Sequence, residues 1–219
     1  MGDEISADSR LRLALVIASM AMGGAERMTV NLATEFARRG HRVDLVLISK
    51  RGPLLERLPG DIRIVDLGAE RARRAIAGLR RYLSDERPDA VLSVAFQTNI
   101  LTMIASLGLR PKPRIILSVP NAYGATMAAM RPPKRILFEA ATRLLYPRAD
   151  GIIGVSKGVC QDLHREAGVP ERLLFPVYNP VLDKQFERLA AEPVEGEFGT
   201  GQNVDAVVTV GRVAEQKDH

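Results

Sequence analysis

A pair of glycines, Gly23 and Gly24, is the feature of this sequence best suited to holding a phosphate. The pair lies between an apolar run at residues 11–18 and a segment, residues 25–36, with apolar side chains at helical spacing. Glycines at such a turn leave the first backbone N–H groups of the helix open to a ligand, and the helix dipole favours an anion there. A tight turn without room for a side chain explains the pair equally well, so both interpretations stay open here.

Polar residues that could contact a hydroxyl-bearing ligand follow two other predicted strands. Asn99 closes a stretch, residues 96–99, that we expect as a loop after one strand, and Asn121 and Tyr123 lie in a loop, residues 120–124, after the next. The carboxyl ends of parallel strands meet at one edge of a sheet, where such folds bind ligands. These side chains and the glycine pair are therefore expected around one crevice.

Strand-like and helix-like segments alternate along the chain, without an internal repeat. Near-continuous apolar runs are typical of strands that are covered on both faces, and apolar residues at helical spacing predict the helices between them. This order predicts an α/β fold with a doubly wound parallel sheet, Rossmann-like in type. The predicted strands are residues 11–18, 43–48, 62–67, 90–94, 114–119, 151–155 and 173–177. The predicted helices are residues 25–36, 69–85, 99–107, 134–146 and 157–167, the last capped by Ser156.

Composition limits the classes of function. Of the 219 residues, 46% are hydrophobic and 26% charged, which is typical of a globular protein, and no apolar run approaches the length of a membrane span. The formal net charge is +5, but aromatic residues are few and tryptophan is absent, which argues against a nucleic-acid partner. One cysteine, Cys160, cannot form an internal disulfide, and we expect it in the core. No cluster with metal-ligand spacing occurs, so we expect neither metal nor cofactor.

The domain boundaries follow shifts in composition. Residues 1–10 are polar and acidic, and we expect them to be disordered. Residues 11–178 carry the alternating pattern and predict the first domain. A polar, acidic and glycine-bearing stretch, residues 179–203, predicts a linker. Residues 204–219 then bring a fresh apolar strand and a glycine turn, which we interpret as the truncated start of a second Rossmann-like domain.

Four motifs follow one another along the chain: Met-Gly-Gly-Ala-Glu-Arg at residues 22–27, Gly-Val-Ser-Lys-Gly-Val at 154–159, Val-Tyr-Asn-Pro-Val at 177–181, and the segment 208–219. Each motif is moderately specific by itself, but the four in this order resemble the glycosyltransferase family 4 type of GT-B enzyme over nearly the whole chain. The resemblance implies two facing Rossmann-like domains, the first on the acceptor side and the second holding a nucleotide-sugar donor, with transfer that retains the anomeric configuration.

The resemblance assigns roles to the donor-binding residues. It implies that Gly23 and Gly24 lie near the donor phosphates, in agreement with the argument from the helix start. It also implies that Arg212 and Lys217 contact the pyrophosphate. Two cations at a strand-to-loop turn can neutralise a leaving diphosphate, whereas the plain alternative is surface basicity.

On the acceptor side the sequence departs from the family pattern. Many relatives place a histidine after the fifth strand, where this chain has Pro120 and Asn121. An amide cannot titrate as a general base, but it can hydrogen-bond to a hydroxyl, so we expect Asn121, Asn99 and Tyr123 to bind the acceptor and name no catalytic residue. A Glu-x7-Glu segment that holds the donor in relatives would lie beyond His219, so we expect this chain to be a fragment that is inactive without its C-terminal half.

The function predicted from the sequence is therefore a retaining, hexosyltransferase-type glycosyltransferase. It would move a sugar from a nucleotide-sugar donor to a saccharide or lipid-linked acceptor, in the cytoplasm, in cell-envelope polysaccharide biosynthesis. Residues 127–138 mix methionines with basic residues, which suits peripheral contact with an anionic membrane at its inner face. A loop at the acceptor site followed by a core helix is the alternative for that segment.

Two other classes of function remain open. One is a non-catalytic domain that binds a saccharide or a partner chain. The other is an NADP-dependent oxidoreductase, for which Lys50 and Arg51 after the second strand could suit a 2′-phosphate. That class requires Gly-x-Gly-x-x-Gly after the first strand, and the glycines here do not match it.

Overall fold

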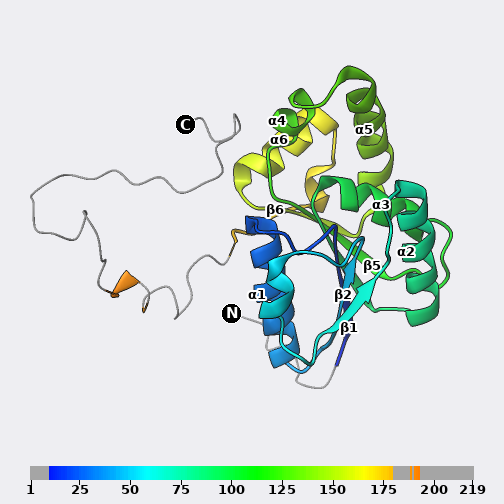
Figure 1. Cartoon of the computed structure of the whole chain (residues 1–219). Coiled ribbons are helices and arrows are strands. Elements are labelled where there is room, and N and C mark those ends of the chain that lie inside the picture. Colours follow the sequence, from blue (N-terminus) through cyan, green and yellow to red (C-terminus); the bar gives the residue numbers. More distant parts are fainter. Residues whose placement is uncertain (1–9, 180–187, 189, 193–219) are drawn as a thin grey trace, which may run out of the picture. The chain divides into compact units, whose positions relative to one another are not determined.

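The computed structural model describes residues 10–179, 188 and 190–192 (Figure 1). The chain divides into two units, residues 1–179 and residues 180–219. The architecture below is that of the first unit. The predicted linker and the predicted start of a second domain lie outside the described residues apart from 179, 188 and 190–192, so these boundaries stay predictions.

The first unit is built on a seven-stranded sheet in which every neighbouring pair is parallel, in the order β3-β2-β1-β4-β5-β6-β7. The predicted doubly wound α/β fold is confirmed, and all seven strands predicted for residues 11–178 are present with ends that differ by at most one residue. The strands are β1 (Arg12–Ile17), β2 (Arg42–Leu47), β3 (Arg63–Asp66), β4 (Ala90–Val94), β5 (Arg114–Val119), β6 (Gly151–Gly154) and β7 (Leu174–Pro176).

The connections between strands are helical, and two of them differ from the prediction. Residues 96–99, expected as a loop, form the first turn of α3, and part of the loop expected at residues 120–124 opens an additional helix, α4. The five helices predicted from periodicity are present. The helices are α1 (Gly24–Arg38), α2 (Ala72–Glu86), α3 (Phe96–Ser106), α4 (Tyr123–Ala128), α5 (Pro132–Leu145) and α6 (Lys157–Ala167), with short 3₁₀ turns η1 (Pro53–Arg57), η2 (Tyr146–Arg148) and η3 (Glu171–Leu173). Among the described residues, no helix combines the length and the apolar character needed to cross a bilayer.

The helices lie on both faces of the sheet, as alternation along the strands requires. Leu15 and Leu45 pack with α1 on one face, while Val16 and Val46, their neighbours in sequence, pack with α2 on the other. In Figure 1, α1 lies to the left of the sheet and α2 and α3 to its right. A third apolar cluster joins β5 and β6 to α3, α4, α5 and α6. Apolar clusters thus cover both faces of β1 and β4, and this packing holds the carboxyl ends of the two strands in position.

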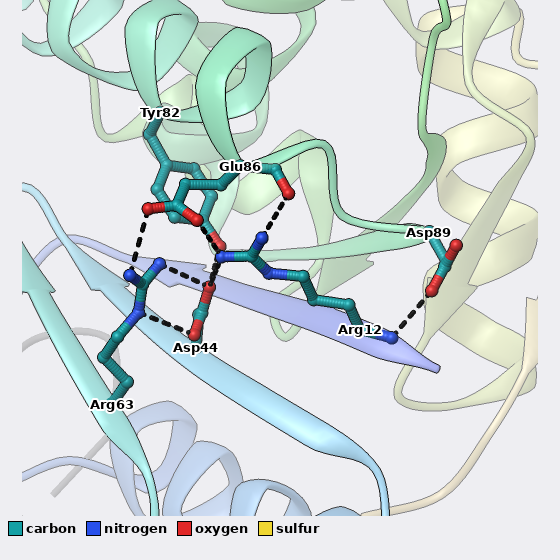
Figure 2. Close-up of polar contacts among 6 residues, drawn as sticks. All are labelled: Arg12, Asp44, Arg63, Tyr82, Glu86 and Asp89. Carbon is teal, nitrogen blue, oxygen red and sulfur yellow. Dashed lines mark hydrogen bonds and ion pairs between the residues drawn. The ribbon is translucent and has the colours of Figure 1, made fainter. Parts of the chain in front are cut away.

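The buried carboxylate of Asp44 lies in the amino-terminal half of β2 and links this strand to its neighbours (Figure 2). Its oxygens accept hydrogen bonds from Arg63 at 2.8 and 2.9 Å, from Arg12 at 3.0 Å and from the Tyr82 hydroxyl at 2.7 Å. Glu86, at the end of α2, pairs with both arginines. Burial by itself raises the pKa of Asp44, but these hydrogen bonds outweigh it and hold the pKa below its ordinary value. The cluster joins β1, β2 and β3 to α2.

Candidate functional site

The strand order places the candidate site between the carboxyl ends of β1 and β4. These strands are neighbours in the sheet, but β1 continues through α1 toward β2, whereas β4 continues through α3 toward β5. The helices α1 and α3 therefore cover opposite faces of the sheet, and their first turns lie on either side of the point where the chain direction reverses. Ligands of doubly wound folds bind at this switch point. The predicted glycine turn lies on one side of this switch point, and the start of α3 lies on the other.

The turn after β1 is held in place by the loop after β2. The backbone N–H of Met20 donates to the Arg51 carbonyl at 2.9 Å, and the N–H of Leu54 donates to the Met20 carbonyl at 3.2 Å. Gly52 lies between these contacts with a φ of +113°, and a Cβ there would lie 2.1 Å from the Met20 oxygen. Only glycine fits this position. The sequence interpretation missed this role, although the Gly52-Pro53 dipeptide marked a turn.

Gly23 and Gly24 open α1 without any side-chain cap. Gly23 is the N-cap residue in an extended conformation, and no side chain accepts a hydrogen bond from the first turn. A Cβ on Gly23 would meet the Glu26 carboxylate at 2.3 Å, so Glu26 folds back over the turn. A Cβ on Gly24 would meet nothing within 4 Å. The protein's own packing therefore does not require glycine at position 24, and the space beside that position is open.

The start of α3 carries backbone strain. Ala95, its N-cap residue, has a φ of 77° and a ψ of 151°, a region that is essentially reserved for glycine and costs on the order of 1–3 kcal/mol. Two backbone hydrogen bonds hold it there: its N–H donates to the Ser118 carbonyl at 3.2 Å, and its carbonyl accepts from the Asn99 N–H at 2.9 Å. Residues in such regions cluster at ligand sites and switch regions, and this one lies at the switch point of the sheet.

The Asn99 side chain stabilises the turn at Ala95 through hydrogen bonds to β5 and the core. This side chain is fully buried, and its Nδ2 donates to the Ser118 carbonyl at 3.0 Å, with a longer contact of 3.4 Å to the Tyr146 hydroxyl. Its Oδ1 has no hydrogen-bond partner among the described residues. Asn99 and Ala95 thus share the same carbonyl of β5. Because the Asn99 side chain is fully buried, direct contact with an acceptor would require the residues that cover it to move.

Tyr123 and Asn121 lie in different surroundings. Tyr123 is buried in the cluster around α3 and α5, its hydroxyl finds no partner of normal hydrogen-bond geometry within the described residues, and burial raises its pKa. Asn121 is exposed. Of the three residues predicted to bind the acceptor, Asn121 is therefore the one whose side chain reaches solvent, and the binding role itself stays a prediction for all three.

Of the remaining predicted features, two lie among the described residues and two lie outside them. Ser156 caps α6 as predicted, its Oγ accepting a hydrogen bond from the Val159 N–H at 3.2 Å. Cys160 is buried in agreement with its predicted core role, and burial raises the pKa of its thiol. Arg212 and Lys217 lie outside the described residues. Within the described part of the chain, no three His, Cys, Asp or Glu side chains gather as metal ligands.

The sequence matches the family model of Glycosyltransferase Family 4 over residues 22–184, well over half of the chain. The chain belongs to Glycosyltransferase Family 4. The match begins one residue before the Gly23-Gly24 turn and continues past β7. The predicted family is confirmed, and three of the four sequence motifs lie within the matched range, whereas the fourth, residues 208–219, lies outside it. This assignment gives no support to the oxidoreductase alternative. Comparison with curated protein sequences gave no significant match.

Solved structures resemble the fold of this family 4 chain. A lipopolysaccharide outer core galactosyltransferase, WaaB, in its apo form aligns with a TM-score of 0.56 at 15% identity, over 77% of this chain and 46% of WaaB. HepE from Anabaena, in complex with UDP and glucose, aligns at 0.58 and 15% identity, over 77% of this chain and 44% of HepE. A UDP-N-acetylglucosamine 2-epimerase from Rickettsia bellii aligns at 0.58 and 17% identity, over 83% and 49%. The chain thus spans less than half the length of these proteins, and the fold by itself does not distinguish a transferase from an epimerase.

The described residues offer a particular kind of chemistry at the crevice. The helices α1 and α3 begin without a side-chain cap. Their first backbone N–H groups therefore donate to no side chain and are available to a ligand. Both helices direct their positive dipole ends to the same edge of the sheet. These backbone N–H groups and helix dipoles can donate hydrogen bonds to a ligand and stabilise negative charge on it. A histidine does not occur at the loop after β5, where Asn121 lies instead.

Proposed function

We propose that the chain is the acceptor-side part of a retaining, hexosyl-type glycosyltransferase that uses a nucleotide-sugar donor and a saccharide or lipid-linked acceptor. Membership of Glycosyltransferase Family 4 supports the reaction class. The observation that carries the proposal is the uncapped first turn of α1 at the switch point, with open space at Gly24 that the protein's own packing does not need. The donor phosphates would occupy that space.

The proposed chemistry rests on charge at the leaving group. A helix start provides roughly half a positive charge together with N–H donors, which stabilises a diphosphate as it departs. Glu26 lies over the turn, so its carboxylate would have to swing away before an anion entered. Arg212 and Lys217 would add two cations from the second domain, and neither metal nor other cofactor is required in this scheme. Asn121 would hydrogen-bond to the acceptor.

The cellular setting is also part of the proposal. We place the enzyme in the cytoplasm, in the assembly of cell-envelope polysaccharide, with peripheral contact with a membrane. Because the chain spans 44–49% of the length of the three solved proteins, we expect turnover only when a second domain is joined to it. The alternative of a non-catalytic saccharide-binding domain is favoured by one observation, the amide of Asn121 at a position where a general base would be expected.

Gly24→Val tests the proposal in a protein that carries both domains. Valine meets no protein atom at its Cβ, so the fold should persist, whereas its methyl groups would fill the space proposed for the donor phosphates. We expect kcat/KM with UDP- or GDP-sugars to fall about 100-fold, the effect of losing one charge-stabilising donor group. Urea unfolding should show an unchanged midpoint.

Gly60→Val is the matched control. Gly60 is exposed, has equally open space at its Cβ, and lies in the turn before β3 at the opposite edge of the sheet. It should leave sugar transfer unchanged. Equal activity of the two variants would mean that the donor does not approach α1. A folded two-domain protein that binds saccharide but transfers no sugar from any donor of the panel would establish the non-catalytic alternative instead.

A further inference from the structure

The outer face of α5 carries large apolar side chains in contact with solvent. Ile136, Leu137 and Leu144 are 63%, 65% and 59% exposed, and Pro133 and Ala140 are exposed as well. At about 100° per residue these five residues fall within an arc of about 100° on the helix. We name them the α5 stripe. An exposed apolar stripe of this width on a helix indicates a surface that something else covers.

The opposite side of α5 is already used. Thr142 and Leu145 are buried there, and Phe138 and Ala141 pack against the core cluster that includes α3 and α6. The helix therefore packs its inner face as an ordinary amphipathic helix does and still presents a second apolar face outward. Figure 1 shows α5 at the periphery of the unit. The stripe is thus not an unburied part of the described core.

The α5 helix and its flanking residues are rich in cations, of which Lys134 and Arg143 lie on either side of the stripe at 100° per residue. The segment 131–148 contains five arginines and lysines but a single carboxylate, Glu139, and all five cations are exposed. Glu139 is partly buried and lies 3.6 Å from the Arg135 guanidinium. Among the elements packed against α5, α3, α4 and η2 carry no carboxylate, and α6 carries Asp162 and Glu166. The Arg143 guanidinium donates to the Glu166 backbone carbonyl. The basic residues are Arg131, Lys134, Arg135, Arg143 and Arg148.

We propose that the α5 stripe is a membrane-docking surface whose occupant is an anionic lipid bilayer. An apolar helix face bordered by lysine and arginine enters the boundary between headgroups and acyl chains, and its cations pair with anionic headgroups. A second copy of the chain fits the surface less well, because two α5 helices facing each other would bring five cations against five. The inference rests on α5 alone and does not depend on the proposed sugar transfer.

Vesicle sedimentation tests the proposal with the 219-residue chain. We expect the chain to sediment with vesicles of phosphatidylcholine and about one third phosphatidylglycerol, and to remain largely in the supernatant with phosphatidylcholine alone. Binding should weaken at 0.5 M salt, where the Debye length falls to about 4 Å. The double variant Ile136→Ser/Leu137→Ser should partition into anionic vesicles at least about 10-fold more weakly, because two large apolar side chains no longer enter the interface.

Matched variants distinguish vesicle binding by the α5 stripe from nonspecific hydrophobic or electrostatic binding. Leu107→Ser removes a leucine that is 45% exposed at the end of α3, and it should bind as the unmodified chain does. Arg131→Gln/Lys134→Gln should weaken binding, whereas Arg73→Gln/Arg74→Gln, which removes equal charge from exposed positions on α2, should weaken it clearly less. All substituted side chains are exposed, and circular dichroism should show an unchanged fold.

Several results would overturn the proposal. It fails if the chain ignores anionic vesicles, or if the Leu107 and α2 variants lose as much binding as the α5 variants. It also fails if the chain forms a lipid-independent dimer that Ile136→Ser/Leu137→Ser abolishes, since a second copy would then cover the stripe. A two-domain protein that no longer binds vesicles would mean that another part of the protein covers α5. None of these outcomes bears on sugar transfer, which the Gly24 variant tests separately.

Discussion

Replacing Asp44 by asparagine should destabilise the fold by about 3 kcal/mol, the lower end of the usual cost of breaking a buried ion pair. The side chain of Asp44 is completely buried, and its carboxylate accepts four hydrogen bonds, three of them from guanidinium groups. In Asp44→Asn one oxygen becomes an NH₂ group that faces an arginine donor, and the other oxygen loses its charge. Arg63 is 41% exposed and can regain water, which keeps the cost low in the range.

Urea denaturation measures this loss. With a slope of about 2 kcal/mol/M, a loss of about 3 kcal/mol lowers the unfolding midpoint by about 1.5 M. The effect should depend on pH in a definite direction. The pKa of Asp44 is lowered in the folded protein, so its stabilisation is fully present above its unfolded pKa of about 3.9 and is lost as the pH falls through the folded value. The difference between the two proteins should therefore be constant from about pH 5 to 7 and shrink below about pH 4.

Asp85→Asn serves as the control for this prediction. Asp85 lies on α2, is 61% exposed, and approaches Arg81 at 3.5 Å, so its removal should change stability by less than about 0.5 kcal/mol. A loss of less than about 1 kcal/mol for Asp44→Asn, or a loss that persisted unchanged in acid, would contradict this prediction. Either result would mean that Arg12, Arg63 and Glu86 hold the strands together without the buried carboxylate.

Two further substitutions test the crevice walls. Gly52→Ala should lower the free energy of unfolding by at least about 2 kcal/mol, because its Cβ overlaps the Met20 carbonyl at a positive φ, and thermal or urea unfolding checks this. Ala95→Gly should raise stability by up to about 1 kcal/mol, because relief of strain exceeds the added entropy of the unfolded chain, and a midpoint in urea that falls instead would show that Ala95 is not strained.

The sheet could be predicted from the sequence because buried parallel strands appear as nearly uninterrupted apolar runs. The runs at residues 11–18, 90–94 and 114–119 are examples, and each forms a strand in the structure. The Gly23-Gly24 turn was predictable for a related reason, since glycines directly after such a run and before a helical period mark a strand-to-helix turn. The family motifs indicated the family, and the match over residues 22–184 confirms that assignment, while the predicted linker and second domain stay predictions.

Other features depend on contacts between distant residues that local patterns do not contain. Ala95 gives no sign of its left-handed backbone, because the hydrogen bond to Ser118 on the next strand imposes it. Asn99 appeared to be a polar residue beside a ligand, yet its amide is used by the same Ser118 carbonyl and is buried. The start of α3 was placed three residues too late because no capping side chain precedes Phe96.

The contact between Gly52 and the Met20 carbonyl also bears on how a ligand would be received at the crevice. Two backbone hydrogen bonds already fix the turn before α1, so its N–H groups are in position before any ligand arrives. A loop that became ordered only on binding would lose about 1–2 kcal/mol of affinity for each residue that it immobilised. Here that ordering occurs during folding. A ligand at this turn would therefore meet a preorganised backbone, and the rearrangement still required would be the displacement of the Glu26 side chain.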